Sequence, residues 1–195
     1  MKIVYTPFHG AGMKLVPEVL RRMGVKELFC VPEQMKPDGD FSTVASPNPE
    51  NPEGFALAEG LANEVGADII IGTDPDSDRI GVMIRGGDGA FHQISGNKMG
   101  VLLLDYITGS RRRSGTLPAD AAVLKTIVTT DMARVAAEKN GVACFETFTG
   151  FKFMAERMKQ FEQDGSYTPI FAYEESYGCL IGDFVRDKDA VTASA

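Results

Sequence analysis

The sequence lacks the features of three large classes of protein. Its apolar runs, such as 101–104, are far shorter than the roughly 20 residues of a membrane-spanning helix, and the N-terminus has no signal-peptide core. Apart from 111–113 the basic residues are scattered, and the net charge of −7 argues against a nucleic-acid binder. The cysteines Cys30, Cys144 and Cys179 are odd in number and form no C-x-x-C pair, so neither a disulfide framework nor a zinc site is indicated. We therefore expect a cytoplasmic protein that binds neither membranes nor nucleic acid.

Nucleotide-binding motifs are also missing. The glycine-containing loop 7–12 lacks the third glycine of a dinucleotide fingerprint, and no G-x-x-x-x-G-K segment occurs. His9 in this loop could orient a phosphate group or cap the helix that follows, and the residues alone leave both interpretations open.

What is present is the composition of a folded protein. Hydrophobic residues make up 44% and charged residues 24% of 195 residues, close to the averages for globular domains. The first part predicts a β-α-β-α-β-β unit, because β-branched runs alternate with segments of helical periodicity. The expected strands are 3–6, 28–31, 69–71, 80–84 and 91–94, and the expected helices follow Gly12 and Asn51.

A second α/β unit follows. The pattern predicts helices at 97–106, 131–139 and 151–161, strands at 123–128, 143–146 and 169–173, and a polar loop at 109–118. The methionines and phenylalanines of 151–161 form a stripe typical of a core-facing helix. We expect two consecutive similar α/β domains, 1–96 and 97–195, each a mixed, mainly parallel sheet flanked by helices.

The most informative stretch is 68–79, D-I-I-I-G-T-D-P-D-S-D-R. Its isoleucines predict a strand buried on both faces, which delivers Asp74, Asp76 and Asp78 to the carboxyl end of the strand, beside Arg79. In open α/β sheets ligands usually bind at that end, and crowded carboxylates need a compensating cation. Oxygen ligands favour a hard ion, so we expect an Mg²⁺ site.

The acidic segment has two other interpretations. An EF-hand calcium loop needs Gly at its sixth and Glu at its twelfth position, and counting from Asp74 these places hold Arg79 and Arg85. That interpretation fails. A solvated acidic turn without a ligand is the other, and the buried strand before it makes it less favoured.

Further polar residues lie at predicted element ends. Thr149 and Gly150 open a helix, where a hydroxyl and backbone N–H groups suit an anion or a sugar hydroxyl, or serve only as a cap. Glu174 and Ser176 alternate after a strand, so on an extended segment both point the same way and can bind adjacent hydroxyls. Lys188 can pair with a phosphate or with a carboxylate in a surface ion pair.

Taken together, six segments resemble the α-D-phosphohexomutases, the superfamily of phosphoglucomutase and phosphomannomutase. In chain order they are Y-T-P-F-H-G-A-G, S-P-N-P-E-N-P-E, T-D-P-D-S-D-R, T-F-T-G-F-K, Y-E-E-S-Y-G and R-D-K-D-A. The resemblance covers essentially the whole chain. Only the acidic segment is distinctive by itself. The other segments support the resemblance because they occur in the same order as in the family.

The resemblance implies a four-domain enzyme that transfers a phosphoryl group between O1 and O6 of a hexose. It implies a phosphoserine, Mg²⁺ and a hexose 1,6-bisphosphate intermediate, with the metal ligands at Asp74, Asp76 and Asp78. Arg79 would lie close to the transferring phosphoryl group, and His9 would border the active site. The phosphorylated hexose would be bound by Thr149, Gly150, Glu174, Ser176 and Lys188.

The chain departs from the family pattern at two points. The family's serine nucleophile lies in a T/S-A-S-H-N-P segment that is absent here, and Ser46 in S-P-N-P matches the proline loop of the second domain instead. The phosphate-binding fourth domain has no counterpart after the K-D-A segment. We therefore expect domains II and III of a longer enzyme, inactive without domains I and IV. E-E-S-Y-G resembles the phosphoglucomutase branch, although glucose, mannose and deoxypentose phosphates are not distinguished.

Two rival functions stay open from the residues. One is an Mg²⁺-dependent phosphatase in which Asp74 is the nucleophile. The other is a non-catalytic module that binds sugar phosphates.

Overall fold

The computed structural model describes residues 1–195, which divide into two compact units. Unit 1 consists of residues 1–95 and 189–195, and unit 2 consists of residues 96–188. The chain therefore leaves unit 1, builds all of unit 2, and returns to unit 1 for its last helix. The domains predicted from the sequence, 1–96 and 97–195, assign residues 189–195 to the second domain.

Unit 1 is a mixed five-stranded sheet with helices on its faces. Its strands run in the order β2-β1-β3-β4-β5, in which β1 pairs in parallel with β2 and β3, and the other pairs are antiparallel. The elements are β1 (Lys2–Thr6), α1 (Gly12–Arg22), β2 (Glu27–Cys30), η1 (Pro32–Gln34), η2 (Pro52–Phe55), α2 (Ala56–Val65), β3 (Ile69–Thr73), β4 (Ile80–Arg85), β5 (Phe91–Ile94) and α6 (Ala190–Ser194).

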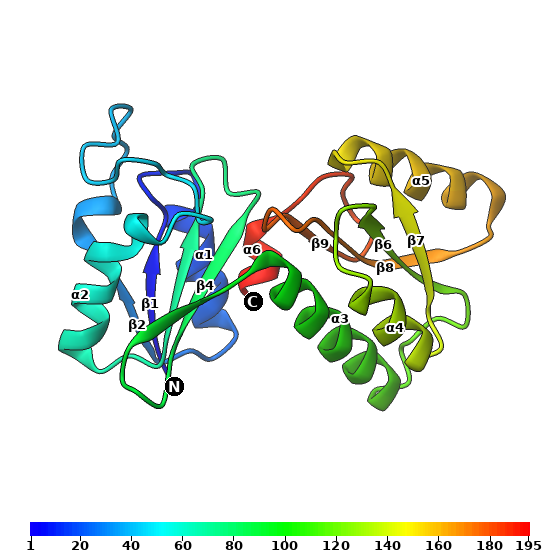
Figure 1. The fold of residues 1–195 in the computed structure, drawn as a ribbon, viewed down its shortest axis with the longest axis horizontal. Coiled ribbons are helices and arrows are strands. Elements are labelled where there is room, and N and C mark those ends of the chain that lie inside the picture. The colour runs from blue at the N-terminus through cyan, green and yellow to red at the C-terminus, as the bar shows by residue number, and fades with distance from the viewer. The chain divides into compact units, whose positions relative to one another are not determined.

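The topology of unit 1 follows from its apolar strands. The chain moves from β1 outward to β2 and back to β3, so right-handed crossovers place α1 and α2 on opposite faces, as Figure 1 shows. Val4 and Ile70 on the central strands are fully buried and pack with Phe8 and Phe55. The parallel strands β1, β2 and β3 therefore all end at one edge of the sheet.

Unit 2 is a four-stranded sheet in the order β7-β6-β8-β9, in which only the β8–β9 pair is antiparallel. Its elements are α3 (Gly96–Arg113), β6 (Ala121–Thr126), α4 (Met132–Lys139), β7 (Ala143–Thr147), α5 (Phe151–Asp164), β8 (Thr168–Tyr173) and β9 (Cys179–Ile181). The expected fold class, two α/β domains with mixed and mainly parallel sheets, is confirmed.

The helices of unit 2 cover both faces of its sheet, with α3 and α4 on one side and α5 on the other (Figure 1). The apolar stripe of α5 is core, as its pattern indicates. Phe151, Met154, Met158 and Phe161 are buried against Leu124 of the central strand β6. The carboxyl ends of β6, β7 and β8 again meet at one edge.

Several element boundaries differ from the sequence prediction, and β9 and α6 were not predicted. Helix α3 continues through Gly109, where a polar loop was expected, and ends at Arg113. Leu104, Ile107 and Thr108 are buried on its inner face, and their burial outweighs the roughly 1 kcal/mol that an interior glycine costs a helix. Strand β6 ends at Thr126, two residues earlier than predicted. No helix in the structure combines the length and apolar character that a membrane crossing requires.

Candidate functional site

The acidic segment forms a loop directly after the buried strand β3. Asp74 is 7% exposed, Asp78 is partly buried and Asp76 is exposed. One carboxylate oxygen from each of these three residues lies within 4.8 Å of the others. The structure thus brings together the three acids that the sequence singled out.

Asp74 holds the loop in shape through its own carboxylate. Its Oδ1 atom accepts hydrogen bonds from the backbone N–H groups of Asp78, at 3.0 Å, and Arg79, at 2.9 Å. The turn between them closes when the N–H of Ser77, a residue with φ 62°, donates to the Asp74 carbonyl. These bonds fix the spacing of the acids, so the cluster is a built feature of the loop.

The charged groups of the acidic loop lie close enough to affect one another. Burial, together with the neighbouring carboxylates of Asp78 and Asp76, raises the pKa of Asp74 to about 7, although the Arg79 N–H group opposes the shift. Arg79 provides partial neutralisation, since its Nε atom lies 3.6 Å from Asp74 Oδ2 and 3.8 Å from Asp78 Oδ1. Its Nη1 atom also lies 3.4 Å from Glu50. Negative charge exceeds positive charge, which favours a cation.

The donor set fits Mg²⁺. In octahedral coordination with metal–oxygen distances of about 2.0–2.1 Å, oxygens on opposite sides of the ion lie about 4.2 Å apart. The spacing of at most 4.8 Å between the carboxylate oxygens is close to that value. Magnesium usually keeps several positions for water or phosphate oxygens, so three carboxylates suffice to hold it.

The glycine-containing loop after β1 supports the acidic loop. The N–H of Ala11 donates to the Pro75 carbonyl at 2.8 Å, and a Cβ atom at Gly10 would lie 2.4 Å from Pro75 Cα. Only glycine permits this approach of the two backbones. The sequence of the loop gave no indication of this contact between Gly10 and the acidic loop.

His9 is 5% exposed, and both of its ring nitrogens have partners. Nδ1 lies 2.9 Å from the Lys36 carbonyl, and Nε2 lies 2.7 Å from the Thr43 hydroxyl, which also accepts from Gln34. The ring does not cap α1, whose N-cap position is Ala11 without a side-chain cap. In this geometry His9 ties down the long loop 36–43.

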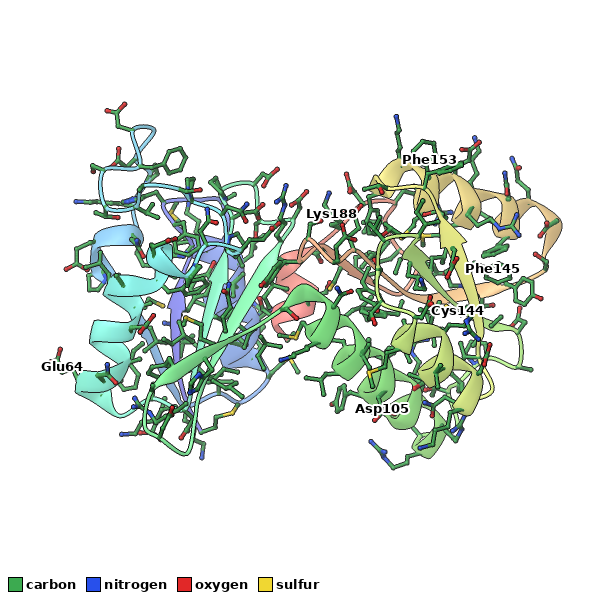
Figure 2. All side chains as sticks on the ribbon, viewed as in Figure 1. Glu64, Asp105, Cys144, Phe145, Phe153 and Lys188 are labelled. Carbon is green, nitrogen blue, oxygen red and sulfur yellow. The ribbon has the colours of Figure 1, made fainter.

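Three of the other predicted residues meet within unit 2. Glu174 is 7% exposed, and its Oε1 atom accepts a hydrogen bond from the Gly150 N–H at 3.3 Å. Its Oε2 atom lies 3.9 Å from Lys188 Nζ. Lys188, labelled in Figure 2 on the segment before α6, also lies over the Phe151 ring at 5.6 Å. A buried carboxylate, a backbone donor and an ammonium group are therefore clustered.

Thr149 and Ser176 lie at the same carboxyl edge of this sheet. Thr149 is exposed at the start of α5, and Ser176 is partly buried in the loop after β8. Both hydroxyls lie on loops that carry a residue of the Glu174 cluster. Such hydroxyls can bind polar groups of a ligand.

A buried polar network beside this cluster was not predicted. Lys125 on β6 is fully buried and lies 2.8 Å from Glu146, while Thr126 and Thr129 donate to Glu175. Lys125 within an otherwise apolar predicted strand could have indicated this network, because a buried charged group requires polar partners.

Comparison with known families identifies the family to which the chain belongs. Residues 1–87 match the model of phosphoglucomutase/phosphomannomutase alpha/beta/alpha domain II, and residues 95–195 match that of domain III. The chain belongs to the phosphoglucomutase/phosphomannomutase family. The resemblance inferred from the sequence motifs is confirmed.

Phosphoglucomutases are among the similar proteins. The chain is 39% identical over 191 residues to the phosphoglucomutase of Staphylococcus epidermidis, which covers 98% of this chain and 34% of that protein. It therefore spans about a third of the length of the curated relatives it matches.

Solved structures of the phosphoglucomutase/phosphomannomutase family share the fold. A family protein from Burkholderia thailandensis has a TM-score of 0.75 at 20% identity, covering 99% of this chain and 38% of that one. The N-acetylphosphoglucosamine mutase of Aspergillus fumigatus, solved in complex with GlcNAc-6P and magnesium, has a TM-score of 0.64 at 13% identity, covering 99% and 40%.

Proposed function

We propose that this chain provides the metal-binding and sugar-binding domains of a phosphohexomutase of the phosphoglucomutase type. The reaction is the interconversion of hexose 1-phosphate and hexose 6-phosphate through a hexose 1,6-bisphosphate. Family membership supports the proposal, and the cluster of Asp74, Asp76 and Asp78 carries it, because phosphoryl transfer depends on positioning and charge neutralisation.

In this proposal the acidic loop holds Mg²⁺ through the three aspartates. The ion supplies electrostatic stabilisation for charge that develops on the transferring phosphoryl group. Arg79 lies within 3.6 Å of Asp74 and adds a guanidinium suited to phosphate oxygens. His9 contributes indirectly, because it fixes the loop 36–43 beside the Gly10–Pro75 contact.

The loop after β8 binds the sugar. Glu174 and Ser176 accept and donate hydrogen bonds to adjacent hydroxyls of the hexose, and Thr149 with the Gly150 N–H approaches from the start of α5. Lys188, whose Nζ atom lies 3.9 Å from Glu174 Oε2, places a positive charge beside this buried carboxylate and offers an ammonium to the substrate phosphate.

The phosphoserine of this reaction lies outside the chain, since no T/S-A-S-H-N-P segment is present. Domains I and IV of the same polypeptide are therefore the expected partners. A rival role for Asp74 as an aspartyl nucleophile is disfavoured by geometry. Its Oδ1 atom already accepts two backbone N–H bonds, and Oδ2 faces Arg79.

The metal site can be tested with Mn²⁺ as a paramagnetic substitute for Mg²⁺. We expect titration of the ¹⁵N-labelled chain to broaden amide resonances of residues 74–79, and excess Mg²⁺ to reverse the broadening. Asp76→Asn should abolish the effect. Asp105→Asn, an exposed acid on α3 labelled in Figure 2, is the matched control and should leave it unchanged. Broadening that survives Asp76→Asn would overturn the assignment.

A separate experiment tests the proposal that the nucleophile lies outside this chain. The purified chain should not convert glucose 1-phosphate into glucose 6-phosphate in a coupled assay with Mg²⁺ and glucose 1,6-bisphosphate. Turnover by the chain that disappears in Asp76→Asn would show that the nucleophile lies within it.

A further inference from the structure

The loop 174–178 closes tightly between β8 and β9. The N–H of Glu174 donates to the Gly178 carbonyl at 2.9 Å, so the loop has little freedom at its base. Glu175 lies between the two residues assigned to the sugar, in the turn that connects the two strands. The extended conformation expected for residues 174–176 is not observed, because Glu175 and Ser176 form a turn and Tyr177 has φ 72°.

Glu175 is bound by two hydroxyl groups from the turn after β6. Its Oε2 atom accepts from Thr126 Oγ1 at 2.9 Å and from Thr129 Oγ1 at 3.0 Å. Thr126 is fully buried and Thr129 is 3% exposed. The Glu175 carboxylate therefore contacts protein hydroxyls that a ligand does not reach.

We propose that Glu175 is a positioning residue, whose anchorage by Thr126 and Thr129 orients Glu174 and Ser176 toward the hexose. The proposal rests on the sugar-binding role given above to the loop after β8. It adds a residue that acts through its neighbours and contacts no substrate atom.

The two threonines are themselves held rigidly. The N–H of Thr129 donates to the Thr126 carbonyl at 3.1 Å, and Lys125 Nζ donates to the Thr129 carbonyl at 3.0 Å. From the other side, Asn97 Oδ1 accepts the N–H of Thr130 at 2.9 Å. Because this turn is rigid, it holds the Glu175 carboxylate in one position.

Backbone packing also restricts the loop. A Cβ atom at Gly96, the first residue of α3, would lie 2.0 Å from the Glu175 carbonyl oxygen and 3.0 Å from the Tyr177 nitrogen. The backbone of Glu175 thus rests against α3 while its side chain is bound by β6. Both contacts act on the residue between the two sugar-binding side chains.

The chemistry of the anchor predicts which substitution preserves it. The hydroxyl oxygens of Thr126 and Thr129 lie 2.6 Å apart, so three mutually close oxygens share two hydroxyl protons. A glutamine at 175 keeps an acceptor oxygen and brings protons of its own, so it satisfies this arrangement. An alanine removes the anchor.

The experiment compares Glu175→Ala, Glu175→Gln and Thr129→Val with the unmodified chain. Thr116→Val, at an exposed threonine of unit 2, is the control. Hydrogen exchange of the Glu174 amide reports loop closure without any ligand. NMR titration with glucose 1,6-bisphosphate reports binding, and thermal unfolding identifies any variant that fails to fold.

We expect Glu175→Ala and Thr129→Val to accelerate exchange of the Glu174 amide by about tenfold and to weaken bisphosphate binding by about tenfold. Glu175→Gln and Thr116→Val should stay within about threefold of the unmodified chain. If Glu175→Ala unfolds, Thr129→Val and Glu175→Gln still decide the outcome. Unchanged exchange in Thr129→Val, or a Glu175→Gln variant as impaired as Glu175→Ala, would overturn the positioning role.

A different result is expected if the proposed sugar-binding function itself is wrong. If the unmodified chain shows no perturbation by glucose 1,6-bisphosphate, or if Glu174→Ala leaves binding unchanged, the sugar-binding assignment is wrong. The exchange measurement does not depend on the sugar, so accelerated exchange in such a case would still locate the anchor of the loop.

Discussion

Gly100 lies directly against the ring of Tyr173. A Cβ atom at this position of α3 would come within 1.9 Å of Tyr173 Cε2, and the tyrosine is fully buried on β8. Neither partner can move without disturbing the strand that leads into the loop 174–178. The absence of one methyl group on α3 therefore sets how closely this helix packs on the sheet.

Gly100→Ala is expected to destabilise the chain by about 2–3 kcal/mol, because the overlap exceeds the benefit of alanine in a helix. Gly60→Ala on α2 is the matched control, since a Cβ atom there would meet nothing within 4 Å. It should stabilise by about 0.5–1 kcal/mol. Urea unfolding measures both values. Equal effects of the two substitutions would contradict the contact.

Asp76→Asn should stabilise the metal-free chain and remove its response to Mg²⁺. The substitution reduces repulsion among three carboxylates whose oxygens lie within 4.8 Å, and it deletes a proposed ligand. We expect a rise of roughly 2–4 °C in Tm without metal. In the unmodified chain added Mg²⁺ should raise Tm, measured by scanning calorimetry. A variant that still responds to Mg²⁺ would count against the site.

Lys125→Met should destabilise unit 2 by about 2–3 kcal/mol, because a charged hydrogen-bond donor is lost from a buried position. Lys125 Nζ lies 2.8 Å from Glu146 Oε1 and donates to the Thr129 carbonyl. Lys139→Met, on the exposed face of α4, should change stability by less than about 0.5 kcal/mol. Chemical denaturation of both variants is the measurement, and similar values would show that Lys125 is not held as described.

The cysteines should react slowly with iodoacetamide at pH 8. Burial raises the pKa of Cys144 to about 11 and that of Cys179 to about 12, and it also raises the pKa of Cys30. Because the thiolate is the nucleophile, alkylation of Cys144 should accelerate about tenfold per pH unit between pH 8 and 10.

Cys144, labelled in Figure 2, lies on β7 and is partly exposed, whereas Cys179 is 2% exposed. Peptide mapping by mass spectrometry should therefore find Cys179 modified last. Early modification of Cys179 would contradict its burial.

Sequence patterns captured the sheets because their strands are short apolar runs. Ile69, Ile70 and Ile71 predict a buried strand whatever surrounds them, and the acids that follow must then lie at its carboxyl end. The clustering of Asp74, Asp76 and Asp78 follows from their spacing along a single loop. The sequence of this one segment was therefore sufficient to predict the acidic cluster.

Contacts between segments that are distant in the sequence could not be predicted from such local patterns. Gly10 and Pro75 meet because β1 and β3 are neighbours, and nothing in either segment indicates the other. Glu175 lies 49 residues from Thr126, and its pairing depends on the register of β6 with β8. The sequence predicts a loop from Gly109 onward, because the cost of a glycine within a helix is a local property, whereas the burial of Ile107 depends on the tertiary structure.

The return of the chain to unit 1 has a consequence for how the protein is made. The N–H of Ala190, at the start of α6, donates to the carbonyl of Ser77 in the acidic loop, and α6 packs against α1 and β4. A ribosome completes all of unit 2 before it synthesises α6. Unit 1 therefore lacks the helix that packs against α1 until residues 190–194 have emerged, and the acidic loop gains its hydrogen bond from Ala190 only then.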